Sequence, residues 1–143
     1  MMTRRLLSEA EGYDLLKAAG IPVPAFFVVT TADAAAQAAD SIGYPVVLKG
    51  ISPEIIHKSD TGRPITGIRS SMEARDAFLA IHKNSGAAYP DAAITGIMVE
   101  QQLAPGLELI IGGKTDPTFG KILTLGSGGR LVEILHDVSL RVL

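Results

Sequence analysis

Helical patterning ends near residue 85 of this 143-residue chain, and that limit constrains the fold more than any other feature of the sequence. The later segments ITGIMVEQQL, GLELIIGG, GKILTLGS and RLVEIL are rich in aliphatic residues and are separated by Pro-Gly, KTDPT and GSGG, which predicts strands joined by turns. A parallel sheet needs a crossover, usually a helix, between neighbouring strands. Because the second half offers none, we predict an α+β fold with antiparallel sheet.

The first half alternates predicted helices and strands. Ser8 with Glu11 forms a capping-box pattern that begins a helix, Thr31 or Asp33 can cap a second one, and Ser71 begins a third. The segments AFFVVT, YPVVLKG and PITGIRS are predicted strands between these helices, and NSGAAYPDA is a predicted turn region.

Charge and composition exclude several classes of function. A formal net charge of -2 gives no broad attraction to nucleic acid or to anionic lipid. The chain contains no cysteine, so disulfides and thiolate metal sites are excluded, and its three histidines lack the spacing of a helical metal pair. No stretch approaches the roughly 20 apolar residues that span a bilayer, and no signal-peptide pattern begins the chain. We predict a cytoplasmic protein that binds neither nucleic acid nor membrane.

Two short glycine motifs suggest nucleotide binding but fail on spacing. The segment GGKT at 112–115 lacks the earlier glycine of a phosphate loop, because that position is Glu108, and no helix follows it. The segment GSGG at 126–129 has Leu131 at the third glycine position of a dinucleotide fingerprint and precedes a strand. Hairpin turns are the better interpretation of both.

A denser group of charged residues follows Lys49, which closes the apolar run YPVVLK. Taken alone, a strand-end lysine that reaches solvent is the simpler interpretation. However, Lys49 is followed within fourteen residues by His57, Lys58, Asp60, Gly62 and Arg63. This segment combines cations, backbone N–H groups and a nucleophilic imidazole that Asp60 can orient, which are the parts needed to hold and accept a phosphoryl group.

A family resemblance rests on six ordered segments, which are AAGIPVP, IGYPVVLK, SPEIIHKSDTG, VEQQLAPGLELIIG, DPTFGKILTLGSGGRLVEIL and DVSLR. In order and spacing they resemble the ATP-grasp domain of nucleoside-diphosphate-forming acyl-CoA synthetases, relatives of succinyl-CoA synthetase, from about residue 7 to the last residue. The resemblance implies the ATP-grasp fold, with antiparallel sheets and flanking helices, in a truncated form. Residues 1–25 would form an N-terminal helix and linker, residues 26–98 the small lid subdomain, and residues 99–143 the incomplete start of the second subdomain.

The resemblance also implies an ATP or ADP site. Lys49 would contact the phosphates, beneath a loop that contains Gly62 and Arg63. Glu100 and the main chain of Gln102 and Leu103 would hold the adenine edge. Glu108 would accept hydrogen bonds from the ribose hydroxyls, as a carboxylate does readily for two neighbouring donors.

His57 matches the histidine that the acetyl-CoA synthetase branch uses as a transient phosphate carrier. For an arbitrary protein a surface histidine is the simpler interpretation, and the resemblance reverses that preference. Lys58, Asp60, Arg63, Glu133 and Arg141 are candidate contacts of the phosphate or of the phosphohistidine, and each is equally explained as a solvated surface residue.

Two departures from the family pattern qualify the resemblance. Arg63 and Pro64 follow Gly62 where the family has a second glycine, so the loop should be stiffer. The family binds Mg²⁺ through an acidic residue and an asparagine, but Asn84 is the only asparagine and ends a predicted helix. The Mg²⁺ ligands are therefore expected downstream of residue 143, and this portion alone is expected to be inactive. A naturally short, inactive homologue is the other possibility.

The predicted reaction is that of an ADP-forming acid–thiol ligase, which converts acyl-CoA, ADP and phosphate into carboxylic acid, CoA and ATP. Its expected partners are a CoA-binding subunit or domain and a small acyl substrate, in an oligomeric enzyme. One alternative is a non-catalytic module that senses nucleotide or CoA beside an acyltransferase. Another is a different ATP-grasp carboxylate ligase, which has no need of His57.

Overall fold

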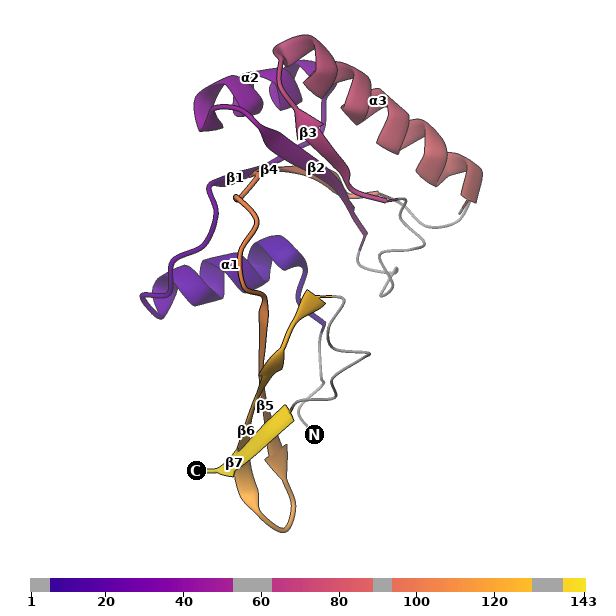
Figure 1. Ribbon diagram of the computed structural model, residues 1–143. Helices are drawn as coiled ribbons and strands as arrows, with labels where there is room; N and C mark the ends of the chain where they lie inside the picture. Colours follow the sequence, from indigo (N-terminus) through magenta and orange to yellow (C-terminus); the bar gives the residue numbers. More distant parts are fainter. Residues whose placement is uncertain (1–5, 53–62, 89–93, 130–137) are drawn as a thin grey trace. The chain divides into compact units, whose positions relative to one another are not determined.

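Two units, Met1–Leu103 and Ala104–Leu143, make up the chain in the computed structural model, which describes residues 6–52, 63–88, 94–129 and 138–143 (Figure 1). The boundary expected from the sequence, between residues 98 and 99, falls inside a strand of the first unit, Gly96–Gln101. Residues 99 and 100 pair with strands on both sides there, so the division lies after Leu103.

The first unit is built on a four-stranded sheet. Its strands are β1 (Phe26–Val29), β2 (Val46–Ile51), β3 (Ile65–Ile68) and β4 (Gly96–Gln101), in the spatial order β1-β4-β2-β3. All neighbours are antiparallel, as the sequence predicts.

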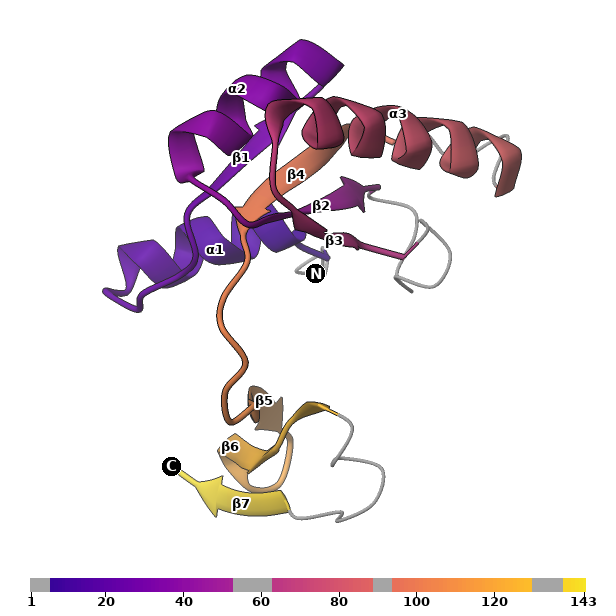
Figure 2. The same cartoon turned by 45° about the horizontal axis from the view of Figure 1, so that its top comes forward.

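Three helices accompany this sheet, α1 (Glu9–Ala18), α2 (Ala32–Ile42) and α3 (Ser71–Ala88). Figures 1 and 2 show α2 and α3 over one face of the sheet and α1 by the other. The core lies beneath α2 and α3, where alternate strand residues meet small helix residues. Fully buried members include Val46, Leu48, Ile97, Val99, Ala35, Ala39 and Ala74.

Helix ends follow local capping chemistry, with two differences from expectation. Ser8 and Glu11 form the predicted capping box, and the Thr31 hydroxyl accepts from the Ala34 N–H at 3.1 Å. The cap of α3 is Ser70 instead of Ser71, because its hydroxyl accepts from the Glu73 N–H at 3.2 Å. This helix runs on to Ala88, through the segment predicted as a turn. Among the described residues, no helix is long and apolar enough to cross a membrane.

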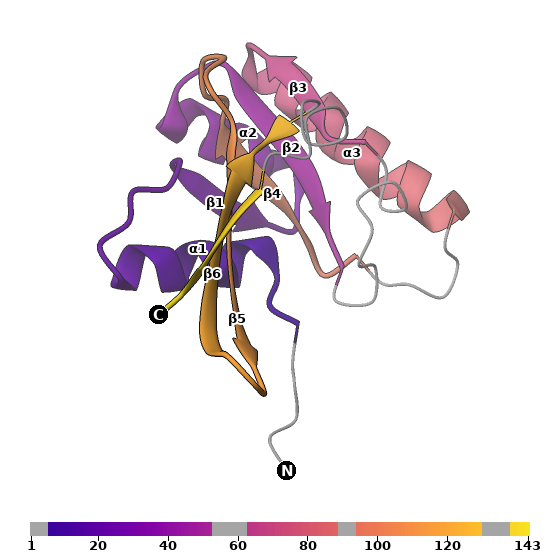
Figure 3. The ribbon, with the colours of Figure 1, turned by 60° about the horizontal axis from the view of Figure 1, so that its bottom comes forward.

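The second unit is a three-stranded antiparallel sheet of β5 (Leu109–Asp116), β6 (Gly120–Ser127) and β7 (Val138–Val142), with β6 in the middle (Figure 3). Residues 112–115, the GGKT segment, lie within β5 and pair with β6, so their interpretation as a hairpin turn is wrong, and the turn follows at residues 117–119. The turn after β5 is held by Asp116 Oδ1, which accepts from the N–H groups of Thr118 at 2.9 Å and Phe119 at 3.1 Å. These two hydrogen bonds hold the pKa of Asp116 below its ordinary value.

Candidate functional site

Four polar side chains from three elements meet on the face of the first sheet opposite the core. The Lys49 ammonium lies 2.9 Å from Glu9 Oε1 and forms a second ion pair with Glu100 Oε2. The Tyr13 hydroxyl donates to Glu100 Oε1 at 2.9 Å. We call Glu9, Tyr13, Lys49 and Glu100 the Lys49 cluster. It joins the candidate phosphate contact to the candidate adenine contact.

Sheet register and helix periodicity bring the Lys49 cluster together. Lys49 stands opposite Met98 and Val47 stands opposite Glu100, so Lys49 and Glu100 are diagonal neighbours on one face. Glu9 and Tyr13 are four residues apart and so lie one above the other on α1. The sequence suggested that Lys49 ends its strand, but β2 continues beyond it to Ile51.

Burial makes the electrostatics of the Lys49 cluster strong. The exposed fractions of the side chains are 19% for Lys49, 8% for Glu100 and 26% for Glu9. Burial alone would lower the pKa of Lys49, but the carboxylates of Glu100 and Glu9 outweigh it and raise the pKa above 10.5. Burial and the hydrogen bond to Glu100 also raise the pKa of the Tyr13 phenol. Lys49 is therefore a charged ammonium, and Tyr13 a neutral donor, at physiological pH.

The two candidate adenine contacts after β4, Gln102 and Leu103, differ in whether the main-chain N–H is already hydrogen-bonded. The Gln102 N–H is occupied, since it donates to the carbonyl of Pro45 at 3.1 Å. Its side-chain oxygen accepts from the Gly67 N–H at 2.6 Å. Within the described part of the chain, the Leu103 N–H has no hydrogen-bond partner. Leu103 therefore has the free main-chain donor that an adenine ring nitrogen requires.

A β-bulge frees the Gly67 N–H from the strand ladder for its hydrogen bond to Gln102. Val46 pairs with Ile68 and Leu48 pairs with Ile65, so two residues of β3 oppose one residue of β2. Gly67 has φ 75°, which turns its N–H out of the ladder and towards Gln102. Apart from the glycine itself, no feature of the sequence predicted this contact.

Glu108 lies against the glycines that follow β6. Its carbonyl accepts from the Gly128 N–H at 2.7 Å. A Cβ atom on Gly129 would lie 2.7 Å from Glu108 Oε2, and one on Gly128 would lie 2.9 Å from the Glu108 carbonyl carbon. The GSGG segment therefore provides space for the candidate ribose contact, a role that its interpretation as a plain turn did not include.

Replacing Gly129 with alanine should displace the Glu108 carboxylate and destabilise the chain. Gly129 has φ 64°, a conformation that costs an alanine about 1 kcal/mol or more, and the added methyl group would overlap Oε2. We expect the free energy of unfolding in urea to fall by about 1–3 kcal/mol. Gly113→Ala is the matched control, because its nearest atom would lie 3.9 Å away. Equal stability of the two variants would contradict the packing described for Glu108.

The remaining candidate residues are placed only in part. Arg63 and Arg141 are exposed, the latter on β7 opposite Leu123. Five candidates lie outside the described residues, namely His57, Lys58, Asp60, Gly62 and Glu133. In the part of the chain that the structure describes, no group of three or more His, Asp or Glu side chains could hold a metal ion.

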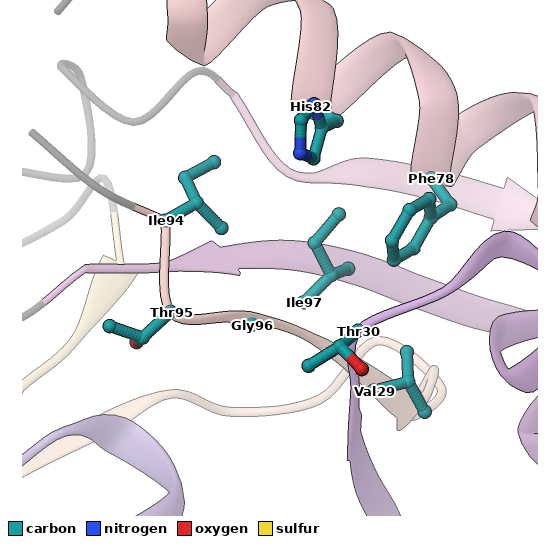
Figure 4. Close-up of a pocket in the computed structure, with 8 residues that line it drawn as sticks. All are labelled: Val29, Thr30, Phe78, His82, Ile94, Thr95, Gly96 and Ile97. Carbon is teal, nitrogen blue, oxygen red and sulfur yellow. The ribbon is translucent and has the colours of Figure 1, made fainter.

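Two pockets of the first unit lie away from the Lys49 cluster. One, at the end of the core, has a volume of about 60 Å³ and includes His82, which stacks on Phe78 (Figure 4). That volume suits a few water molecules and not a nucleotide. The other, of about 330 Å³, lies between β3 and α3 and includes Glu73 and Asp76, whose charge disfavours a polyphosphate. Neither pocket contains a cation for phosphate.

Comparison with known proteins identifies similar sequences along almost the whole chain. The family described as ATP-grasp domain matches residues 2–143. The beta subunit of acetate–CoA ligase [ADP-forming] I from Pyrococcus furiosus is 46% identical over 138 residues, which are 96% of this chain and 60% of the relative. The 4-hydroxybutyrate–CoA ligase [ADP-forming] of Nitrosopumilus maritimus is 43% identical over 136 residues, which cover 95% of this chain and 20% of the relative.

Solved structures are similar as well. The dinucleotide forming acetyl-coenzyme A synthetase 1 of Ca. Korarchaeum cryptofilum, in complex with coenzyme A, Ca-AMPCP and HgCl+, matches with a TM-score of 0.90 and 41% identity. The match covers 97% of this chain and 61% of that one. Another structure of that synthetase holds coenzyme A and Mg-AMPPCP with its phosphohistidine segment pointing towards the nucleotide binding site. It matches with a TM-score of 0.75 and 38% identity, over 96% of this chain and 56% of that one.

Proposed function

Because the chain belongs to the ATP-grasp domain family, we propose that it is the nucleotide-binding portion of an ADP-forming acyl-CoA synthetase. The predicted fold, an α+β ATP-grasp fold with antiparallel sheets, is confirmed by the family match and the solved structures. The observation that carries the proposal is the 46% identity to an acetate–CoA ligase beta subunit. The chain spans 60% of that relative's length, so the activity belongs to a longer protein or assembly.

The proposed reaction proceeds through two phosphoryl transfers. Phosphate displaces CoA from acyl-CoA and forms an acyl phosphate at a site outside this chain. The imidazole of His57 then attacks the phosphorus, and the carboxylic acid leaves with the former bridging oxygen. In the last step a β-phosphate oxygen of ADP attacks the phosphohistidine, which yields ATP and restores His57. The solved relative with a phosphohistidine segment supports this role for the HKSD segment.

Residues of this chain would bind the nucleotide that receives the phosphate. Lys49 keeps its charge in the cluster and would contact the phosphates, with Gly62 and Arg63 in the loop above them. Glu100 and the Leu103 N–H would bind the adenine edge, and the carboxylate of Glu108 would bind the ribose. The main-chain carbonyl of Gln102 is its remaining candidate contact, because its N–H is already occupied. Lys58, Asp60, Glu133 and Arg141 are further candidates for contacts with the phosphate on His57.

Mg²⁺ is the metal expected with the nucleotide, but the Lys49 cluster does not fit it. Both carboxylates of the cluster are paired with the Lys49 ammonium, and an adjacent cation opposes a second one. The Mg²⁺ ligands are expected beyond residue 143. We further propose a CoA-binding subunit or domain as partner, an oligomeric complete enzyme and a cytoplasmic location.

A titration of the chain with ADP, followed by NMR, tests the proposal. We expect ADP to bind with a dissociation constant in the high micromolar range or weaker, and Mg²⁺ to change it less than threefold, because the metal ligands are expected beyond residue 143. Shifts should concentrate at Lys49, Glu100 and Leu103. No shift at saturating ADP would reject nucleotide binding, whereas tight and Mg²⁺-dependent binding would contradict the expected position of the metal ligands.

A further inference from the structure

Helix α1 contacts the sheet through polar and aromatic side chains instead of through a packed apolar face. None of its residues is buried. Besides the contacts of Glu9 and Tyr13 within the Lys49 cluster, α1 makes two contacts with the Phe26 ring. The Tyr13 ring meets it edge to face, with ring centres 5.3 Å apart, and the Lys17 ammonium lies 4.5 Å from its centre. The position of α1 is therefore fixed to a large extent by the cluster.

The charges of the Lys49 cluster are poorly suited to a purely structural role. Two carboxylates accompany one ammonium, so its net charge is -1 when Glu9, Glu100 and Lys49 are counted. Burying an ion pair of this kind costs more than burying an apolar contact of the same size. An anchor for α1 alone would not need Glu9 beside Glu100.

The cluster leaves hydrogen-bonding capacity on the two residues that face the proposed nucleotide. An ammonium has three N–H donors, and the carboxylates of Glu9 and Glu100 engage two of them. A carboxylate has about four acceptor positions, and Lys49 and Tyr13 occupy two of those on Glu100. Counted over the described residues, one donor on Lys49 remains, which suits a phosphate oxygen. One acceptor position on Glu100 Oε1 also remains, which suits an exocyclic amine, because Oε2 is completely buried.

We propose that Glu9 and Tyr13 are positioning residues for nucleotide binding, which hold Lys49 towards phosphate and Glu100 towards the base. This inference rests on the proposed function. A lysine side chain has four flexible carbons, and a second carboxylate restricts it to one direction. Tyr13 restrains the Glu100 carboxylate in the same way, through its 2.9 Å hydrogen bond.

The roles of the two residues predict different ligand preferences. Glu9→Gln weakens the restraint on Lys49 only, so ADP affinity should fall about tenfold while adenosine affinity stays the same. Tyr13→Phe releases Glu100, so the affinities for ADP and adenosine should both fall, by about three- to tenfold. A merely structural role would not distinguish ADP from adenosine. The dissociation constants come from NMR titrations of the whole chain with each ligand.

Matched controls exist for both substitutions. Asp14→Asn makes the same charge change on α1, at an exposed residue that has no hydrogen bond or ion pair within the described ranges. This control measures how much ADP affinity rises when any negative charge is removed from α1, and that rise is small at exposed positions. Tyr44→Phe removes a phenol that donates to Asp40 at 2.6 Å, away from the cluster. Both controls should bind ADP and adenosine within twofold of wild type.

Three results decide the inference. ADP affinity that is unchanged or tighter in Glu9→Gln overturns it, and a tighter complex would mean that Glu9 competes with phosphate. Equal loss of ADP and adenosine affinity in Glu9→Gln also overturns it, in favour of a structural role. If Glu9→Gln unfolds, Tyr13→Phe, which keeps the ring against Phe26, decides together with its free energy of unfolding in urea. Loss of affinity for both ligands at unchanged stability supports the inference, whereas unchanged affinities, or a loss that accompanies lower stability, overturn it. A wild-type chain that binds neither ligand would instead reject the proposed function.

Discussion

Replacing His57 with alanine is expected to abolish phosphoenzyme formation and to lower turnover by about 10⁴-fold or more in the complete synthetase that contains this chain. An alanine has no nitrogen to accept the phosphoryl group, and a direct transfer from acyl phosphate to ADP would require both sites to meet. The measurement is incubation with Mg-ATP labelled at the γ-phosphate, followed by detection of an acid-labile, base-stable label and by an assay of ATP formation from acyl-CoA, ADP and phosphate.

His82 provides the control for this experiment. It is exposed on α3, stacks on Phe78 at a ring distance of 6.3 Å and lies outside the Lys49 cluster. The His82→Ala variant should keep both the label and the turnover. A His57→Ala enzyme that turned over at the normal rate would exclude the carrier role and favour a ligase that releases its acyl phosphate.

Replacing Lys49 with methionine should destabilise the chain and remove most of its affinity for ADP. Methionine fills the volume of the lysine stem but leaves Glu100, which is 6% exposed, beside Glu9 and without its ion pair to Lys49. Removing one partner of a buried ion pair typically costs 3–5 kcal/mol, and the partial exposure of Lys49 and Glu9 reduces this to about 2–3 kcal/mol. The measurement is urea unfolding at pH 7, with ADP titration of the folded variant.

The pH dependence and a double variant identify the cause. Because the pKa of Lys49 is raised above 10.5, the stabilisation from its charge is complete below about pH 10.5 and is lost as the pH rises through the higher folded value. The stability difference between wild type and Lys49→Met should therefore shrink only at more alkaline pH. Adding Glu100→Gln to Lys49→Met should restore most of the stability. A single variant as stable as wild type would show that the buried carboxylates do not need Lys49.

Local features of the fold were predictable because they depend on neighbouring residues. Ser8 with Glu11 identifies the start of α1, and the Asp-Pro turn at 116–117 identifies the end of β5. The lack of helical crossovers after residue 85 was enough to predict antiparallel sheets. The end of α3 was missed, since Gly86 and Asn84 favour a turn and yet lie within the helix.

Contacts between distant residues were not predictable, because they depend on strand order and register. From the residues alone Lys49 was a candidate anion contact, and Glu100 entered only through the family resemblance. Lys49 and Glu100 form an ion pair because β4 lies next to β2. Glu9 joins them because α1 lies by the same face of the sheet. The hydrogen bond between Gly67 and Gln102 depends on a bulge in β3. No periodicity in a single sequence encodes such pairings.

The strand order β1-β4-β2-β3 has a consequence for synthesis of the protein on the ribosome. Among the described strands, β1 borders only β4, which is the last strand of its sheet to leave the ribosome. Until Gly96–Gln101 emerges, the nascent chain presents two unpaired strand edges, on β1 and on β2, with the apolar face beneath α2 incomplete. Such edges are the surfaces that chaperones shield and that promote aggregation, so slow translation before Gly96 should lower the yield of folded protein.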